Sequence, residues 1–188
     1  MKVLNIKNMV CPRCIEAVSH TMEDNHFTVR SIKLGEVILD EDLDDAQLNL
    51  LGDSLKRIGF ELLSDKKSRI VNQLRSEIIR MIHYDDDLDS STRISSRLSK
   101  NLGIDYSYLS KLFSDVEGVT IERYFILQKV EKIKELLVYD ELSISEIAYK
   151  MNYSSSQHLS RQFKSTTGLT PTEFKSSTNK RRLSLDQV

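Results

Sequence analysis

The sequence predicts an α+β protein, in which a small mixed unit of strands and helices precedes an all-helical region. Two observations predict this division. Over residues 1–66, loosely alternating apolar residues are interleaved with amphipathic stretches, whereas from Lys67 onward apolar residues recur every three or four positions. The charge also differs. Residues 1–66 carry 8 Lys/Arg and 12 Asp/Glu, a net charge of −4, and the other 122 residues carry 19 and 16, a net charge of +3.

The first part is expected to follow the order βαββαβ. Residues 2–10 alternate loosely between apolar and polar side chains, which indicates a strand, and residues 11–24 have the apolar spacing of a helix. Two strands, an amphipathic helix and a last strand follow over residues 27–34, 36–43, 44–59 and 60–63. Val29 and Ile32 break strict alternation, so the register of the second strand stays open. The order is the split βαβ of ferredoxin-like folds.

About seven helices are expected after residue 66. The first is long, since Ile70, Leu74, Ile78 and Ile82 recur every four residues. The acidic cluster at residues 85–87 matches a helix C-terminus poorly and indicates where this helix ends. The other helices are expected to begin near Thr92, Asp105, Thr120, Ser143, Ser154 and Pro171.

Two of these helices form a recognisable pair. Ser143 and Glu146 make a capping box, in which Ser143 accepts from the third backbone N–H of the helix and Glu146 reaches back. The small side chain of Ala148, on the apolar face, lets a second helix cross closely. Asn152 tolerates the left-handed conformation that a turn needs, and serines 154–156 open the next helix. Two helices joined by such a short turn are the helix-turn-helix design.

The second helix of the pair has an outward face suited to DNA. Leu159 and Phe163 are predicted to point inward, while Gln157, Arg161 and Lys164 point to the opposite side. Glutamine pairs with adenine, arginine with guanine, and lysine neutralises phosphate. A solvated surface face, which any helix needs, is the alternative interpretation of the same residues.

Motifs across the helical region agree in order and spacing with one family. They are residues 142–148, Tyr153, residues 159–164, Gly168 and residues 170–175, preceded by residues 108–113, Gly118, Tyr124 and residues 134–137. With these motifs, residues 67–178 resemble the AraC/XylS family of transcriptional regulators. The chain departs from the family's usual residues at Ser99, Lys129, Ile133 and Asn152.

The resemblance implies two helix-turn-helix units, with two recognition helices held apart by the helix that begins at Thr120. About 18 residues span about 27 Å, which with flanking turns approaches the roughly 34 Å between successive major-groove faces. By positional match the first recognition helix presents Tyr106, Ser107, Ser110 and Lys111. The second presents Ser156, Gln157, His158 and Arg161, with Ser160 on its flank and Lys164 at the DNA backbone. The first set has one strong base reader, so weaker specificity is expected from it.

A second motif, Met9-Val-Cys11-Pro-Arg-Cys14, contains both cysteines of the chain. Such a local pair in a reducing compartment is typical of metal or redox chemistry rather than of a disulfide framework. At a helix N-terminus the two thiolates are expected to have lowered pKa values and to converge on one side. Two soft sulfur ligands suit Cu(I), whereas Zn(II) would need further ligands.

Together with the βαββαβ order and Ile58-Gly59-Phe60, this motif resembles the heavy-metal-associated domain of copper chaperones and transporting ATPases. Asn8 stands where that family usually has glycine. Three interpretations of the cysteines stay open: a metal site, a vestigial pair in a fold used for ligand-free contacts, and a thioredoxin-like redox pair. His20 and His26 are expected at the surface rather than as ligands.

From these motifs we expect a sequence-specific DNA-binding transcriptional regulator. Residues 1–66 form its heavy-metal-associated-like domain, residues 67–178 its AraC-type domain, and residues 179–188 a basic, disordered tail. The expected partners are double-stranded promoter DNA and a second copy bound through the N-terminal domain. One soft metal ion, Cu(I) before Zn(II), is the expected cofactor, and DNA binding is expected not to require it.

Two other functions are considered. The main alternative is a copper-trafficking or sensing protein whose helices serve as a scaffold, and the next is a dithiol oxidoreductase. The sequence contains no catalytic constellation away from the cysteines, so no enzyme is expected. No apolar run approaches the roughly 20 residues that span a bilayer, and no signal-peptide pattern is present, which predicts a cytoplasmic protein without a membrane partner.

Overall fold

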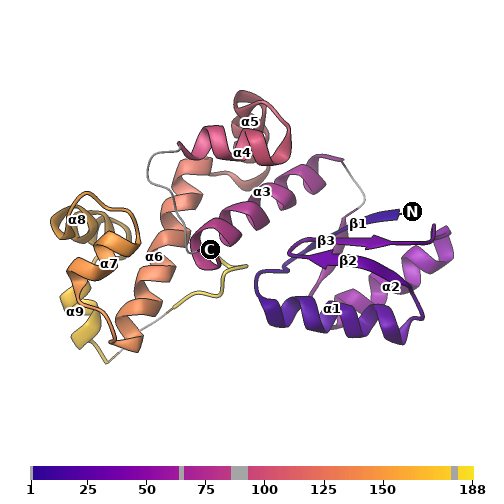
Figure 1. Ribbon diagram of the computed structural model, residues 1–188, viewed down its shortest axis with the longest axis horizontal. Helices are drawn as coiled ribbons and strands as arrows, with labels where there is room; N and C mark the ends of the chain where they lie inside the picture. Colours follow the sequence, from indigo (N-terminus) through magenta and orange to yellow (C-terminus); the bar gives the residue numbers. More distant parts are fainter. Residues whose placement is uncertain (1, 64–65, 86–92, 179–181) are drawn as a thin grey trace. The chain divides into compact units, whose positions relative to one another are not determined.

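Four short strands and nine helices occupy the part of the chain that the structure describes. The computed structural model describes residues 2–63, 66–85, 93–178 and 182–188 (Figure 1). These residues form two compact units, Met1–Glu77 with Leu98–Gly118, and Ile78–Arg97 with Val119–Val188. The predicted α+β composition is confirmed. The division into units does not fall at residues 66 and 67, and the predicted domain boundaries stay predictions.

The first unit contains an antiparallel sheet. Its strands are β1 (Lys2–Lys7), β2 (Val29–Lys33), β3 (Glu36–Leu39) and β4 (Glu61–Leu63). Their spatial order is β2-β3-β1-β4, and every neighbouring pair is antiparallel. The register of β2 against β3 shifts between Val29 and Ser31, which explains why alternation breaks in this strand. The order βαββαβ is as predicted, while the assignment to ferredoxin-like folds stays a prediction.

Helices α1 (Pro12–Asp24) and α2 (Asp45–Arg57) cover one face of the sheet (Figure 1). Pro12 occupies the first turn of α1, where its missing N–H costs no hydrogen bond, and Asp44 caps α2 in a capping box with Gln47. The core between these helices and the sheet is built of Leu4, Ile6, Met9, Val18, Met22, Phe27, Val37, Leu39, Leu43, Leu51, Leu55 and Phe60.

The first half of α3 (Lys66–His83) binds the sheet through polar side chains. The buried Asn72 donates from Nδ2 to the carbonyl oxygens of Ile6 (3.1 Å) and Gly35 (3.3 Å). Gln73 donates to Asn5 Oδ1 at 3.2 Å, so the residue on β1 that points away from the α1–α2 core also has a partner. This half of α3 therefore belongs with the sheet.

The remaining helices are α4 (Ile94–Leu102), α5 (Tyr106–Glu117), α6 (Ile121–Tyr139), α7 (Ile144–Lys150), α8 (Ser156–Thr167) and α9 (Pro171–Ser176). With α3 they make seven, as predicted, among the described residues. In the second unit α6 packs against α7, α8 and α9. The second half of α3 contributes the buried Ile78, Ile79, Met81 and Ile82 to this unit. No helix in the described ranges is long and apolar enough to cross a membrane.

The end of the chain lies along α6. Leu183 N–H donates to Oε2 of the buried Glu131 at 3.0 Å, and Arg182 pairs with Glu135 at 2.9 Å. Gln128, which is fully buried, donates to the carbonyl oxygen of Leu185 at 3.1 Å. Buried polar groups of α6 thus bind residues within 182–188, while the disorder expected of the tail stays a prediction. Residues 179–181 of that tail lie outside the described residues.

Candidate DNA-binding surface

The first helix-turn-helix unit is formed by α4 and α5. Gly103, whose φ of +66° favours glycine, begins the turn between them, and Asp105 caps α5 by accepting from the N–H groups of Ser107 (2.9 Å) and Tyr108 (3.3 Å). Leu109, Leu112 and Phe113 are buried, so α5 has a fixed inward face.

The side chains of α5 that the sequence predicts to contact DNA do not belong to this buried face. Ser107 and Lys111 are exposed, while Tyr106 and Ser110 are half-buried. The exposed pair contains one cation, and Asp115 on the same helix is also exposed. The surface of α5 therefore has little excess positive charge with which to hold phosphate.

The second unit, α7 and α8, has the predicted local geometry. Ser143 and Glu146 form the capping box, with Ser143 N–H donating to Glu146 at 2.8 Å. The hydrogen bonds from Ser143 hold the pKa of the Glu146 carboxyl below its usual range. Asn152 adopts φ +52°, the left-handed conformation predicted for the turn. Ser155 then caps α8 by accepting from His158 N–H at 3.1 Å.

Helix α8 has one buried and one exposed face, as predicted. Leu159 and Phe163 are fully buried, and the Phe163 ring meets Phe174 of α9 edge-on at 5.6 Å between centroids. Gly168, at φ +82°, ends the helix. The exposed residues on α8 include Gln157, His158, Arg161 and Lys164, while Ser156 and Ser160 are half-buried. The helix therefore presents two cations and two hydrogen-bonding side chains to solvent.

Tyr153 and Gln162 were not assigned to this surface from the sequence. Tyr153, in the turn, donates from its hydroxyl to Gln162 Oε1 at 2.5 Å and meets the His158 ring edge-on at 5.3 Å. Burial raises the pKa of the Tyr153 phenol to about 12, so it stays a neutral donor at physiological pH. Neither contact has a local sequence signal beyond the spacing of Tyr153, His158 and Gln162.

The two cysteines converge, as predicted, at the start of α1. Cys11 is the N-cap residue, Cys14 lies in the first turn, and their sulfur atoms are 3.1 Å apart. The predicted lowering of both pKa values is wrong for Cys14, because its burial against the α1–α2 core raises the pKa of the thiol.

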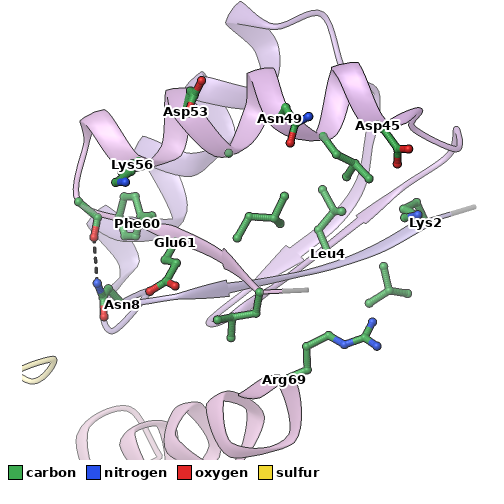
Figure 2. Close-up of a pocket in the computed structure, with 16 residues that line it drawn as sticks. Lys2, Leu4, Asn8, Asp45, Asn49, Asp53, Lys56, Phe60, Glu61 and Arg69 are labelled. Carbon is green, nitrogen blue, oxygen red and sulfur yellow. Dashed lines mark hydrogen bonds between the residues drawn. The ribbon is translucent and has the colours of Figure 1, made fainter. Parts of the chain in front are cut away.

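The loop before the cysteines is held by Asn8. Asn8 adopts φ +73°, and its Nδ2 donates to the carbonyl oxygen of Gly59 at 2.9 Å, as Figure 2 shows. Asparagine tolerates this conformation better than most residues, which accounts for its place where the resembled family has glycine. Asn8 also lines a groove of about 940 Å³ whose rim mixes Lys2, Lys56, Asp45 and Asp53 (Figure 2).

Within the described ranges no three His, Cys, Asp or Glu side chains gather around a common point that could hold a metal ion. His20 and His26 supply no third ligand to the cysteines. The donor set at α1 is therefore two thiols, which fits a low-coordinate soft cation and leaves tetrahedral Zn(II) two ligands short.

Comparison with known proteins bears on the helical part of the chain. Residues 98–177 match the family model described as a helix-turn-helix domain. This part of the chain is therefore similar to a helix-turn-helix domain. The matched range starts within α4 and ends just after α9, so it covers the second helix-turn-helix unit and all of the first except the start of α4. It lies inside the predicted range 67–178.

Two curated relatives have regulator names. An uncharacterized HTH-type transcriptional regulator of Staphylococcus aureus (strain MSSA476) is 32% identical over 114 residues, which are 61% of this chain and 14% of the relative. The uncharacterized HTH-type transcriptional regulator YtdP of Bacillus subtilis (strain 168) is 24% identical over 102 residues, 54% of this chain and 13% of its own length. The chain thus spans a small part of the length of these relatives.

Two solved structures are similar to part of this chain. The C-terminal domain of AraT, a response regulator from Geobacillus stearothermophilus, is 26% identical, covers 64% of this chain and 92% of its own, and has a TM-score of 0.49. The C-terminal domain of the response regulator yesN from Fusobacterium nucleatum is 27% identical, with coverages of 55% and 99% and a TM-score of 0.47.

Proposed function

We propose that this protein is a sequence-specific DNA-binding transcriptional regulator that reads the major groove chiefly with α8. The observation that carries the proposal is the outward face of α8, where Gln157, Arg161 and Lys164 are exposed opposite the buried Leu159 and Phe163. The helix-turn-helix domain match supports this use of the face, because in that design the second helix of a unit enters the groove.

The exposed side chains of α8 divide by role. Arg161 can donate two parallel bonds to guanine, Gln157 can pair with adenine, and Ser156, His158 and Ser160 flank them. Lys164, one turn before Gly168, is placed to neutralise phosphate. On α5, Lys111 is the strongest candidate, with Tyr106, Ser107 and Ser110 beside it. We expect α5 to position the protein and α8 to select the sequence.

Arg161→Ala is expected to weaken binding to the preferred DNA site by about 1–3 kcal/mol and to relax the preference at one base pair, because one bidentate pair is lost. Lys164→Ala is expected to weaken binding to all sequences alike and to reduce the salt slope by about 1. The preferred site is first selected from random duplexes with the wild-type protein, and affinities are then measured by fluorescence anisotropy at several salt concentrations.

A random duplex of the same length is the matched control DNA. Equal loss on selected and random DNA for Arg161→Ala would contradict its base-reading role. Failure of the wild type to select any sequence would remove the proposed function and favour the alternative, in which the helices scaffold a metal-trafficking or dithiol protein.

The cysteine pair supports a finer proposal, which is that the protein responds to a soft metal ion. The sulfur atoms of Cys11 and Cys14 are already 3.1 Å apart, so the ligands need little rearrangement to share one Cu(I). When bound, the ion would be held by the two deprotonated sulfurs. If metal alters DNA affinity, DNA must alter metal affinity by the same factor.

Cys11→Ser and Cys14→Ser are each expected to abolish tight Cu(I) binding while preserving the fold, because one sulfur ligand cannot hold the ion as two do. Competition titration against a Cu(I) chelator measures this, with His20→Gln as the control that should bind like the wild type. Cu(I) binding that survives both serine variants would reject the site. Binding that is unchanged by the selected DNA would leave a metal site without a regulatory role.

Two further parts of the function stay proposals. A second copy bound through residues 1–66 would give the regulator two DNA-reading halves, and sedimentation of the full chain tests this. A regulator of transcription also has to reach the chromosome, so we place the protein in the cytoplasm. We also expect DNA binding itself not to require metal.

A further inference from the structure

A half-buried lysine in the second unit has aromatic rings as its partners. Lys129, on α6, places Nζ 4.0 Å from the centroid of the Tyr153 ring and 5.9 Å from that of Phe125. An ammonium at this distance from a ring face is attracted by the ring quadrupole, and the attraction is stronger when the pair is shielded from water. Lys129 therefore holds the Tyr153 ring from the side of α6.

The Tyr153 ring in turn contacts two residues of α8. Its hydroxyl donates to Gln162 at 2.5 Å, and its edge meets His158, whose Nδ1 lies 3.1 Å from Ser154 Oγ. The backbone of Tyr153 is fixed as well, since its N–H donates to the Ala148 carbonyl oxygen at 2.9 Å. His158 and Gln162 are four residues apart, so one ring sets two successive turns of α8.

From this chain of contacts we propose that Lys129 is a positioning residue for DNA recognition, which clamps the Tyr153 ring and thereby fixes the side chains of α8 before DNA binds. Lys129 acts through Tyr153 and does not itself touch DNA. The proposal rests on the proposed function, because it assigns Lys129 a part in reading sequence. It adds a residue outside the helix-turn-helix motif to the recognition machinery.

The charge of Lys129 provides a readout that a purely structural role would not move. Burial lowers the pKa of its ammonium to about 8, so the cation is lost as the pH rises through that value. The titratable groups that face it are the Tyr153 phenol from the turn and, beyond the ring, His158 of α8, whereas Phe125 on α6 carries no charge. Burial keeps the pKa of Tyr153 at about 12, above this range.

Lys129→Met, which keeps the length of the side chain without its charge, is compared with Lys129→Arg, which keeps a cation for the ring at every pH used. Affinities for the selected duplex and for a random duplex are measured at pH 7 and pH 9, after thermal melting shows that each variant is folded. The His158 ring resonances are recorded by NMR without DNA.

Lys129→Met is expected to lower affinity for the selected duplex about tenfold, with little change on random DNA, and Lys129→Arg to restore it to within about twofold. Between pH 7 and pH 9 the wild type should lose more specific affinity than Lys129→Arg. The His158 resonances should shift in the methionine variant and return in the arginine variant.

Equal specific affinity of Lys129→Met and wild type, no rescue by arginine, or equal pH dependence of wild type and Lys129→Arg would each overturn the proposal. These outcomes are distinct from failure of the proposed function, in which the wild type itself would not prefer the selected duplex. In that case an NMR shift of His158 in Lys129→Met that arginine reverses would support the clamp, and an unchanged spectrum would overturn it.

Discussion

Gly35→Ala is expected to lower the free energy of unfolding by about 2–4 kcal/mol. Gly35 lies at the β2–β3 turn with φ +77°, a conformation that costs an L-residue about 1 kcal/mol or more. The added Cβ would also come within 2.4 Å of Ser76 Oγ and 2.8 Å of Asn72 Nδ2 on α3. Ser76 can rotate away, but Asn72 is held by its bonds to the buried carbonyl oxygens of Ile6 and Gly35.

Gly59→Ala is the matched control for this variant. Gly59 has a similar φ of +87°, but no atom beyond its chain neighbours lies within 4 Å of the added Cβ, so only the backbone strain of about 1 kcal/mol is expected. Urea denaturation of the two variants and the wild type measures the difference. Equal destabilisation of both would show that α3 does not pack on the β2–β3 turn.

Proton uptake by His83 alone is expected to lower the free energy of unfolding of the wild type by about 2–3 kcal/mol as the pH falls from about 6.5 to 4. His83 Nε2 lies 3.1 Å from Gln128 Oε1, and burial, followed by the charge of Lys132, lowers the pKa of the imidazole to about 4. Because the folded pKa is below the unfolded one, the unfolded chain takes up the proton first, so stability is present above pH 6.5 and is lost on acidification.

His83→Gln removes this proton uptake while keeping a polar side chain near Gln128. Thermal or urea unfolding at several pH values between 4 and 7 should show a smaller dependence on pH in the variant than in the wild type. Carboxylates away from His83, such as Glu146, whose pKa is lowered by hydrogen bonds from Ser143, destabilise both proteins alike in acid. The difference therefore reports His83 together with Glu135, whose charge is coupled to it. Parallel pH curves for the two proteins would contradict the assignment.

The elements and their ends could be predicted from the sequence where the signal is local. A capping box joins residues three apart, so Ser143 with Glu146 was visible, and the positive φ of Asn152 follows from the residue type alone. The broken alternation at Val29 and Ile32 marked the irregular register of β2, although its exact form needed the partner strand.

Contacts between residues far apart in the chain could not be predicted. No sequence pattern near Asn72 indicates that its side-chain amide donates hydrogen bonds to carbonyl oxygens 66 and 37 residues earlier. For this reason α3 was assigned to the helical region alone. The residues after Arg182 carry no local pattern that pairs them with α6. The hydrogen bonds that these residues make come from groups on α6, among them the buried Glu131 and Gln128.

The candidate site could be predicted where its residues share one helix. It could not be predicted where it depends on contacts between residues far apart in the chain. Helical periodicity placed Gln157, Arg161 and Lys164 outward, because all three lie on one short helix. Lys129 lies 24 residues before Tyr153, and a lysine at that distance has no pattern that pairs it with a ring. The pKa of Cys14 also depended on packing, since burial outweighs the helix N-terminus.

The irregular register of β2 also bears on how copies of this protein can associate. The edge strands of the sheet are β2 and β4, and regular exposed edges are templates for aggregation between copies. The register shift interrupts β2, which also carries Arg30 and Lys33, and β4 is only three residues long. Among the described residues neither edge is a regular template, so a dimer formed through residues 1–66 is expected to join by helical surfaces rather than by pairing of sheet edges.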